Sequence, residues 1–361
     1  MRRTNRYSVI KGTGSYIPEV AIKNDYFLNH KFFDKSGDPV DKPNAEVIEK
    51  FREITEIEER RWARADQNTD DLGYLAALEA IKDAKIDPEL LDYIIVAHNY
   101  GNVYLGSPVP VTLPTIAARI KHKLGIKNPN TVAYDLPFGC PGWVQGVIQA
   151  DYFIKSGDAN LALVIGAETL SRVSDPHDLD SMIYSDGAGA VVLEGLESET
   201  PVGVLAHKTR SDTIDHYNLL WMDKSNNPDY TSNDLFLKML GRKVYEYAIT
   251  YVPLVVKECI EKSRVKISDI KKILIHQANG KMDYVIVQKT LRLFGIKESP
   301  ERIMPMIIAR LGNSSVATVP VLLDMILNRQ LENHRLESGD HYILASVGAG
   351  MNINAIVYRI P

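Results

Sequence analysis

Long apolar runs are missing from this sequence. The uncharged stretch Leu136–Ala150 is interrupted by three glycines and two prolines, and it falls short of the roughly 18 apolar residues that a membrane-spanning helix needs. The basic start of the chain, Met1–Gly14, contains only a short apolar stretch, which is unlike a signal peptide. We therefore expect a cytoplasmic protein that does not enter a membrane.

Cysteines are also few, and the net charge is small. The two cysteines, Cys140 and Cys259, form no Cys-x-x-Cys motif, and none of the nine histidines stands in a metal-ligand spacing such as HExxH. A disulfide framework, a zinc cluster and a catalytic metal are therefore not expected. The net charge of −4 argues against a nucleic acid bound through bulk positive charge.

Short apolar runs alternate with amphipathic stretches along the chain, a pattern typical of an α/β fold. The 361 residues, 45% of them hydrophobic, can bury a sizeable core. Charged and turn-forming residues fill Lys31–Asn44, which predicts a surface insertion. Strands are predicted at Tyr7–Ile10, Tyr93–Val96, Leu161–Ile165, Ala190–Leu193, Lys272–Ile275 and Tyr342–Ala345, and helices over Asp70–Ala84 and Val252–Ser263.

Two pairs of segments indicate an internal duplication. Ala80–Ala97 aligns without a gap on Cys259–His276, and Ser156–Glu168 aligns on Ser338–Gly350 at nearly the same offset. The common order predicts two similar halves, residues 1–198 and residues 199–361. In such a unit, the nucleophile candidate Cys140 and Asn313 occupy equivalent places at the N-terminal ends of two central helices.

Cys140 is the strongest candidate for chemistry. It lies in FGCPGW, directly before Pro141, and proline is favoured in the first turn of a helix. A helix N-terminus lowers the pKa of a nearby thiol and so favours the thiolate. The alternative is a buried structural thiol, which is the interpretation given to Cys259 within its amphipathic helix.

His276 and Asn313 are the two other candidates. His276 ends the apolar run ILIH, which places it where α/β folds keep their sites, although it could be an ordinary histidine at a strand end. Asn313, in LGNSSV, could simply cap the helix that follows. Beside a histidine, its amide is suited to hold a carbonyl oxygen that becomes an enolate.

Two glycine motifs complete the pattern. Gly12–Gly14 lacks the third glycine of a dinucleotide-binding fingerprint and is interpreted as a tight turn. Gly348–Asn352 follows the last-but-one predicted strand, where backbone N–H groups could form an oxyanion hole.

Cys140, together with HQAN at His276–Asn279 and GNSSVATVP at Gly312–Pro320, resembles the β-ketoacyl-acyl-carrier-protein synthase III family of the thiolase-like superfamily. The resemblance implies a five-layered αβαβα fold of two similar halves, and a homodimer. It implies that an acyl thioester acylates Cys140, with the oxyanion on the N–H groups of Cys140 and Ala349. His276 and Asn313 then hold a malonyl thioester during decarboxylation. No metal or cofactor is implied beyond the coenzyme A or acyl carrier protein that bears the substrates.

Two positions take their roles from the resemblance alone. Leu113 matches a residue that closes the acyl pocket of the partner subunit, and Lys281 matches a basic position where the acidic carrier protein docks. The alternatives are a core leucine and a solvated lysine. The chain departs from the family in Asn44–Phe51, which lacks a tryptophan, and at Glu246, which replaces a basic residue. These departures suit a specialised ketosynthase, which would use a carrier-bound acyl group or join a β-ketoacyl chain to a second acyl chain, as dialkylresorcinol-forming relatives do.

Three other functions stay open. The chain could be an acyltransferase or thioesterase on the same fold, a non-catalytic partner subunit, or a nucleotide-binding oxidoreductase. The presence of Cys140, His276 and Asn313 favours condensation, because pure acyl transfer needs no decarboxylation pair and a non-catalytic partner typically lacks the nucleophile. The incomplete glycine motif disfavours the oxidoreductase.

Overall fold

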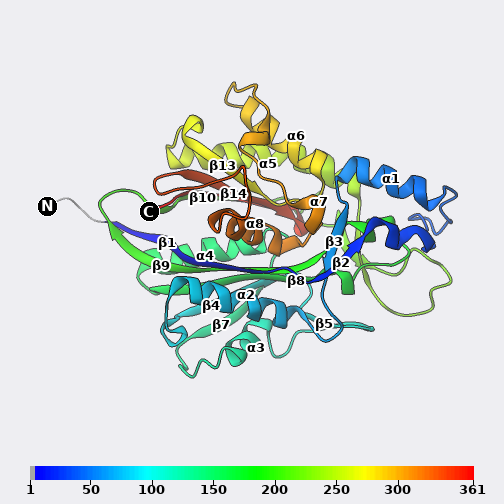
Figure 1. Cartoon of the computed structure of the whole chain (residues 1–361), viewed down its shortest axis with the longest axis horizontal. Coiled ribbons are helices and arrows are strands. Elements are labelled where there is room, and N and C mark those ends of the chain that lie inside the picture. The colour runs from blue at the N-terminus through cyan, green and yellow to red at the C-terminus, as the bar shows by residue number, and fades with distance from the viewer. Residues whose placement is uncertain (1–4) are drawn as a thin grey trace.

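Two stacked β-sheets form the frame of the protein in the computed structural model, which describes residues 5–361 (Figure 1). The N-terminal sheet has the strand order β1-β9-β8-β4-β7, and the C-terminal sheet has the order β10-β15-β14-β13. The strands of these sheets are β1 (Asn5–Tyr16), β4 (Tyr93–His98), β7 (Val132–Pro137), β8 (Leu161–Thr169), β9 (Asp186–Ser198), β10 (Gly203–Ser211), β13 (Ile270–Ile275), β14 (His341–Gly348) and β15 (Asn352–Arg359).

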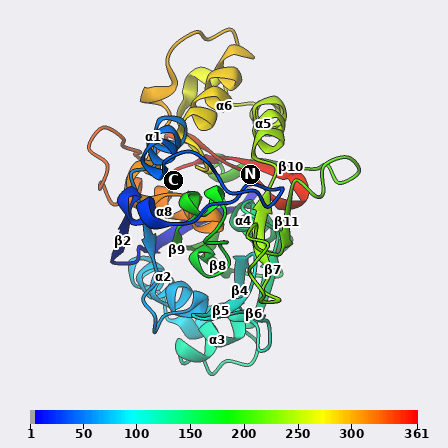
Figure 2. The ribbon, with the colours of Figure 1, turned by 90° about the vertical axis from the view of Figure 1, so that its right-hand side faces the viewer.

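Helices cover both outer faces and fill the space between the sheets (Figures 1 and 2). A central apolar cluster joins the two middle helices to both sheets, and a separate cluster lies under each outer helix layer. The resulting order of helix, sheet, helix, sheet and helix confirms the predicted five-layered αβαβα fold. The outer helices are α2 (Thr69–Ala84), α3 (Ile116–Lys123), α5 (Gly241–Ser263) and α6 (Gly280–Arg292), and the middle ones are α4 (Gly142–Ser156) and α8 (Thr318–Leu327).

The two sheets repeat one topology. In each, the first three strands of the order are antiparallel neighbours, and the fourth strand runs parallel to the third. The duplicated sequence segments are the pairs β4/β13 and β8/β14, as the alignment predicts. The N-terminal sheet ends with β9 at Ser198, and the C-terminal sheet begins with β10 at Gly203.

Two sequence predictions need correction. Gly12–Gly14 forms no turn but lies inside β1, because α2 packs directly on this strand: a Cβ at Gly14 would lie 2.3 Å from the backbone N of Ala80. Helix α5 begins at Gly241 rather than at Val252 and continues through Pro253, because the residues on both sides of the proline are buried in the apolar cluster under this helix, among them Tyr247 and Val256.

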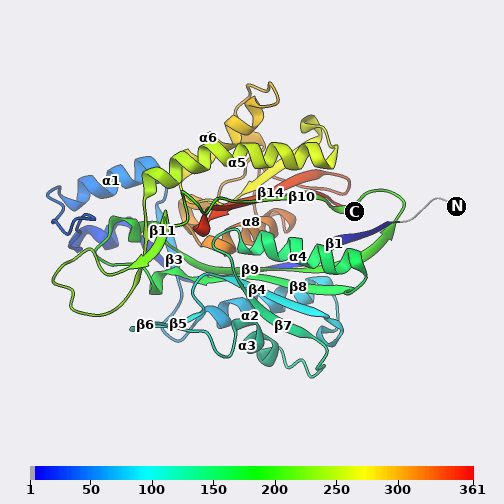
Figure 3. The same cartoon turned by 180° about the vertical axis from the view of Figure 1, so that it is seen from behind.

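The smaller elements gather at the end of the molecule away from both termini (Figures 1 and 3). The predicted insertion Lys31–Asn44 is mostly exposed and buries Phe32. Among the described residues, we find no helix with the length and apolar character to cross a membrane. These smaller elements are α1 (Asn44–Thr55), α7 (Ile308–Leu311), β2 (Val20–Lys23), β3 (Glu59–Trp62), β5 (Asn102–Tyr104), β6 (Ser107–Val111), β11 (Leu220–Asp223) and β12 (Phe236–Met239).

Candidate active site

Cys140 lies in a tight loop between β7 and α4, and its neighbour in space is the glycine turn after β14. A Cβ at Gly348 would lie 2.6 Å from the backbone N of Cys140, and a Cβ at Gly139 would lie 2.9 Å from the backbone N of Ala349. Only glycines allow the two loops to approach so closely. The approach brings the N–H group of Ala349 beside Cys140, where the sequence predicts an oxyanion hole.

Cys140 is half-buried in this loop. Burial raises the pKa of Cys140 to about 11, and the negative charge of Glu168 acts in the same direction. A hydrogen bond from the Ser315 hydroxyl to Sγ, at 3.2 Å, partly opposes this rise. The net effect is a raised pKa for the thiol, because the cost of desolvating its charge outweighs the hydrogen bond from Ser315.

His276 follows directly after β13, and its backbone N donates to the carbonyl of Ala345 at 2.9 Å. Burial lowers the pKa of His276 to about 4, so the imidazole is neutral near pH 7. Its Nδ1 is buried without a hydrogen-bond partner among the described residues. A ligand in the cavity can therefore meet this side chain at Nε2.

Asn313 is fixed by the loop that precedes α8. Its backbone N donates to the carbonyl of Ile183 at 3.0 Å, and its carbonyl accepts from the N of Ser185 at 2.8 Å. The side-chain oxygen of Asn313 accepts from the N of Ser315 at 2.8 Å. Because the oxygen is used in this way, the NH2 group is the part of the amide that a ligand can meet.

Gln277 links the segments that carry His276 and Asn313. It is completely buried, and its side-chain oxygen accepts from the N of Ile307 at 2.9 Å and of Ile308 at 3.1 Å. These bonds tie the end of β13 to the segment that leads to Asn313. The next polar residue of the motif, Asn279, caps α6 by accepting from the N of Met282 at 3.1 Å.

Cys140, His276 and Asn313 meet in one small cavity, which also contains Ser315 and Ala349 in its wall. Its volume is about 60 Å³, far below the roughly 300–1,000 Å³ of ordinary ligand sites. The fold thus brings the three candidate residues together at one cavity. The other lining residues are Asn99, Tyr100, Leu170, Tyr184, Leu220, Leu237, Met239, Val244, Ala278, Met282, Val347 and Gly348.

A much larger groove of about 1,150 Å³ runs beside this cavity. Met239, Val244, Ala278 and Met282 line both spaces, so they form the wall between them. Helix α1 and the insertion form the far side of the groove, with Val40, Val47, Phe51 and Ile54 among its apolar lining residues.

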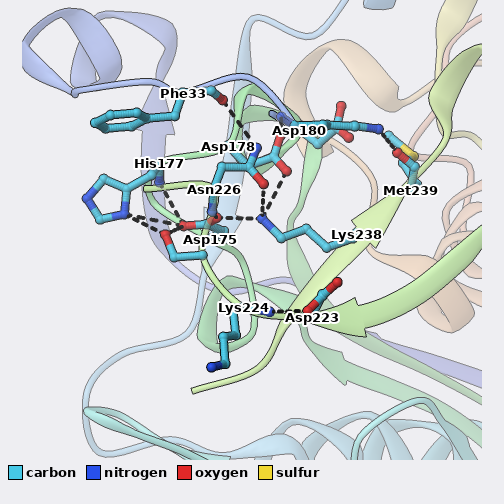
Figure 4. A network of polar contacts seen from close by, with 12 residues as sticks. Phe33, Asp175, His177, Asp178, Asp180, Asp223, Lys224, Asn226, Lys238 and Met239 are labelled. Carbon is cyan, nitrogen blue, oxygen red and sulfur yellow. Dashed lines mark hydrogen bonds and ion pairs between the residues drawn. The ribbon is translucent and has the colours of Figure 1, made fainter. Parts of the chain in front are cut away.

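A buried charged cluster holds the strand that provides Met239 (Figure 4). The Nζ of Lys238 lies 2.5 Å from Asp175 Oδ2 and 3.2 Å from Asp178 Oδ2, and it donates to Asn226 at 2.7 Å. The side chains of Lys238, Asp175 and Asp178 are nearly inaccessible to solvent. The insertion is attached here too, because the Nζ of Lys35 donates to the carbonyl of Met239.

The two positions predicted from resemblance alone lie outside the cavity. Leu113 is 80% exposed, so the alternative of a core leucine is wrong. Lys281 is exposed in the first turn of α6, next to Met282 of the shared wall. Cys259 is completely buried and its thiol donates to the carbonyl of Ala355 at 3.4 Å, as expected for a structural cysteine.

Sequence reasoning missed three polar residues next to the nucleophile. Asn99 follows β4, Glu168 lies near the end of β8, and Ser315 stands two positions after Asn313. Polar residues at the ends of buried strands were the available signal for the first two. For Ser315, only its place in the same short motif as Asn313 pointed to the site.

Comparisons with known proteins agree with this geometry. The family model described as 3-oxoacyl-[acyl-carrier-protein (ACP)] synthase III matches residues 134–213, and the model of its C-terminal part matches residues 260–360. A β-ketoacyl-[acyl-carrier-protein] synthase III of Staphylococcus aureus (strain Newman) is 31% identical over 351 residues, which are 97% of this chain and 98% of that protein.

Solved structures of similar proteins cover the same length. The 3-oxoacyl-[acyl-carrier-protein] synthase III of Aquifex aeolicus VF5 is 28% identical with a TM-score of 0.79, covering 98% of this chain and 99% of that one. The corresponding protein of Pseudomonas aeruginosa PAO1 is 26% identical with a TM-score of 0.80, covering 98% of both chains.

Proposed function

The chain belongs to the β-ketoacyl-[acyl-carrier-protein] synthase III family, and we propose that Cys140 is the residue that carries the acyl group in its reaction. The protein is a condensing enzyme of this type. The convergence of Cys140, His276 and Asn313 in one enclosed cavity is the observation that supports the residue roles.

The first half-reaction we propose is acylation of Cys140. The sulfur attacks the carbonyl of an acyl thioester, the new C–S bond forms, and the carrier thiol leaves with the proton that Cys140 gives up. The N–H groups of Cys140 and Ala349 hold the developing oxyanion, as preorganised donors do in other acyl-transfer sites. Because the thiol is protonated in the free protein, substrate binding and loss of its proton are coupled.

The second half-reaction is decarboxylative condensation. The bond between the carboxylate and the central carbon of a malonyl thioester breaks, carbon dioxide leaves, and the electron pair forms an enolate. Neutral His276 and the NH2 group of Asn313 donate to the enolate oxygen. The enolate carbon then attacks the acyl carbonyl, which releases the sulfur of Cys140 and gives a β-ketoacyl thioester. The carboxylate supplies the electron pair, so we propose that no metal or further cofactor takes part.

The groove is the proposed route for the substrate arm. An acyl carrier protein would dock at its mouth beside Lys281, with the thioester arm passing the wall formed by Met239 and Met282. Glu246, which stands where the family has a basic residue, pairs with Arg242 at 3.0 Å and with Lys243 at 3.5 Å. Lys281 is the basic residue that we propose meets the acidic carrier.

The exposed hairpin of β5 and β6 is the proposed contact with a second copy of the chain. It presents apolar side chains that are unusual on a monomer surface: Tyr104 (43% exposed), Leu105 (62%), Val109 (66%) and, in the following loop, Leu113 (80%). In a homodimer, Leu113 would reach the partner's acyl pocket. Sedimentation analysis of Leu113→Asp tests this, with a dimer of the unchanged protein and a shift toward monomer expected for the variant.

Release of carbon dioxide tests the condensing function. The purified protein is given an acyl thioester and malonyl-acyl-carrier protein, and both carbon dioxide and the β-ketoacyl product are measured. We expect both in equal amounts. Release of free acid without carbon dioxide would instead indicate a thioesterase on this fold.

A specialised ketosynthase is the second candidate function. It is favoured by the insertion, which adds Asp34, Pro39 and Val40 to the lining of the groove. Such an enzyme would join a β-ketoacyl chain to a second acyl chain. Replacing malonyl-carrier protein by β-ketoacyl thioesters in the same assay separates the two candidates by the mass of the product.

A further inference from the structure

Three polar side chains form a continuous hydrogen-bonded chain behind the nucleophile. The Ser315 hydroxyl donates to Sγ of Cys140 at 3.2 Å. The Nδ2 of Asn99 donates to Oγ of Ser315 at 2.9 Å, and it also donates to Oε2 of Glu168. The backbone N of Asn99 donates to the same carboxylate oxygen at 3.0 Å.

These bonds fix the direction of the hydroxyl. The amide of Asn99 uses its NH2 group on Ser315 and Glu168, so the amide cannot rotate freely. Because Asn99 donates to the hydroxyl oxygen of Ser315, the single hydroxyl hydrogen is directed to the sulfur. The hydroxyl is therefore a donor to Cys140, which stabilises the thiolate more than the thiol.

The internal duplication shows where these hydrogen-bonded residues lie in the fold. Asn99 follows β4 as His276 follows β13, and Glu168 lies near the end of β8 where the Ala349 turn follows β14. The N-terminal half thus contributes polar residues near the ends of the same two strands that, in the C-terminal half, are followed by His276 and the Ala349 turn.

We propose that Ser315, Asn99 and Glu168 are positioning residues that set the reactivity of Cys140, with Ser315 stabilising the thiolate and Glu168 opposing it. The inference rests on the proposed function in one respect, namely that Cys140 is the nucleophile. It assigns opposite effects to two side chains that are linked through the same amide.

The charges around Cys140 and Glu168, the two ends of this hydrogen-bonded series, support these opposite effects. The negative charge of Glu168 raises the pKa of Cys140. Burial raises the pKa of Glu168 itself to about 7, while the hydrogen bonds from Asn99 and the nearby His98 act in the opposite direction. The charge of Glu168 therefore changes near neutral pH. The other titratable groups that face this region are Tyr100, Tyr184, Asp186 and His276.

The test is the rate of Cys140 alkylation by iodoacetamide, followed by mass spectrometry of the Cys140 peptide at several pH values between roughly 7 and 10. This range lies below the raised pKa of about 11, so the rate is proportional to the thiolate fraction. Ser315→Ala should slow alkylation about tenfold at each pH, which corresponds to a rise of about one unit in the pKa of the thiol. Glu168→Gln, which keeps an acceptor for Asn99, should speed alkylation at each pH. Ser314→Ala is the matched control, because its hydroxyl lies 3.3 Å from Thr318 and does not contact Cys140.

Equal alkylation rates for Ser315→Ala and Ser314→Ala would overturn the proposal, and so would slower or unchanged alkylation in Glu168→Gln. If Ser315→Ala unfolds, Ser315→Gly removes the same hydroxyl and suits the φ of 52° at this position. Alkylation needs no thioester, so the two claims fail separately. Alkylation rates that change as expected in a protein that no thioester acylates would refute only the proposed function.

Discussion

Gly348 packs directly on the backbone of Cys140, and a Cβ at residue 348 would lie 2.6 Å from the N of Cys140. Gly348→Ala must therefore push the two loops apart and move Ala349 away from the sulfur. Because small displacements of reacting groups are costly, we expect acylation of Cys140 to slow about 100-fold. Stopped-flow release of the carrier thiol measures this rate.

Gly187→Ala is the control for this prediction. A Cβ at Gly187 would lie 3.6 Å from its nearest neighbour, the carbonyl of Tyr16, which is an ordinary contact. If Gly348→Ala acylates at the unchanged rate, the close contact between the two loops is not needed for acylation and the prediction is wrong.

Asn313→Ala should separate the two half-reactions. The NH2 group of Asn313 is assigned to the enolate and not to acylation, so the acyl-enzyme should form while carbon dioxide release falls about 100- to 1,000-fold. Asn328→Ala, which removes a bond of 2.8 Å to Asp324 at the end of α8, serves as the matched control. If Asn313→Ala slows both steps equally, the assignment of this amide to decarboxylation is wrong.

Lys238→Met should destabilise the protein strongly. The change leaves Asp175 and Asp178 buried without their cation, a loss of about 3–5 kcal/mol in the free energy of unfolding. Urea denaturation measures the effect. Lys35→Met is the comparison, because Lys35 is exposed and its Nζ donates to the carbonyl of Met239, so its loss should be below about 1 kcal/mol. Similar losses in the two variants would contradict the role given to the buried cluster.

Glu168 makes stability depend on pH in a predictable direction. Its pKa is raised in the folded protein from 4.5 to about 7, so the stabilisation by its bound proton is complete below pH 4.5 and is lost as pH rises through about 7. The unchanged protein should lose up to about 3 kcal/mol relative to Glu168→Gln over this window. Urea denaturation of both proteins at the two ends of the window measures the difference. A flat or opposite dependence would show that the pKa of Glu168 is not raised in the folded protein.

Much of the fold was predictable because the buried strands are continuous apolar runs. The predicted strands at Tyr93–Val96, Leu161–Ile165 and Lys272–Ile275 lie within β4, β8 and β13. Local patterns failed where packing decides the conformation: Gly12–Gly14 has turn composition, but its glycines serve the close contact between β1 and α2.

The site was predictable in its residues and less so in its electrostatics. Cys140, His276 and Asn313 stand in recognisable motifs at the ends of elements. The pKa of the thiol depends on burial and on Glu168, which no local pattern around Cys140 reveals. The hydrogen bond from Ser315 joins residues that are 175 positions apart, so only the folded chain shows it.

The central claim is that Cys140 accepts an acyl group from a thioester. Its most direct test is the intact mass of the protein after incubation with a panel of acyl-coenzyme A and acyl-carrier-protein thioesters. The account predicts a mass gain of one acyl group with some donors, none in Cys140→Ala, and loss of that gain when malonyl-carrier protein is added. A correctly folded protein that gains no mass with any donor, or Cys140→Ala that gains the same mass, would contradict it.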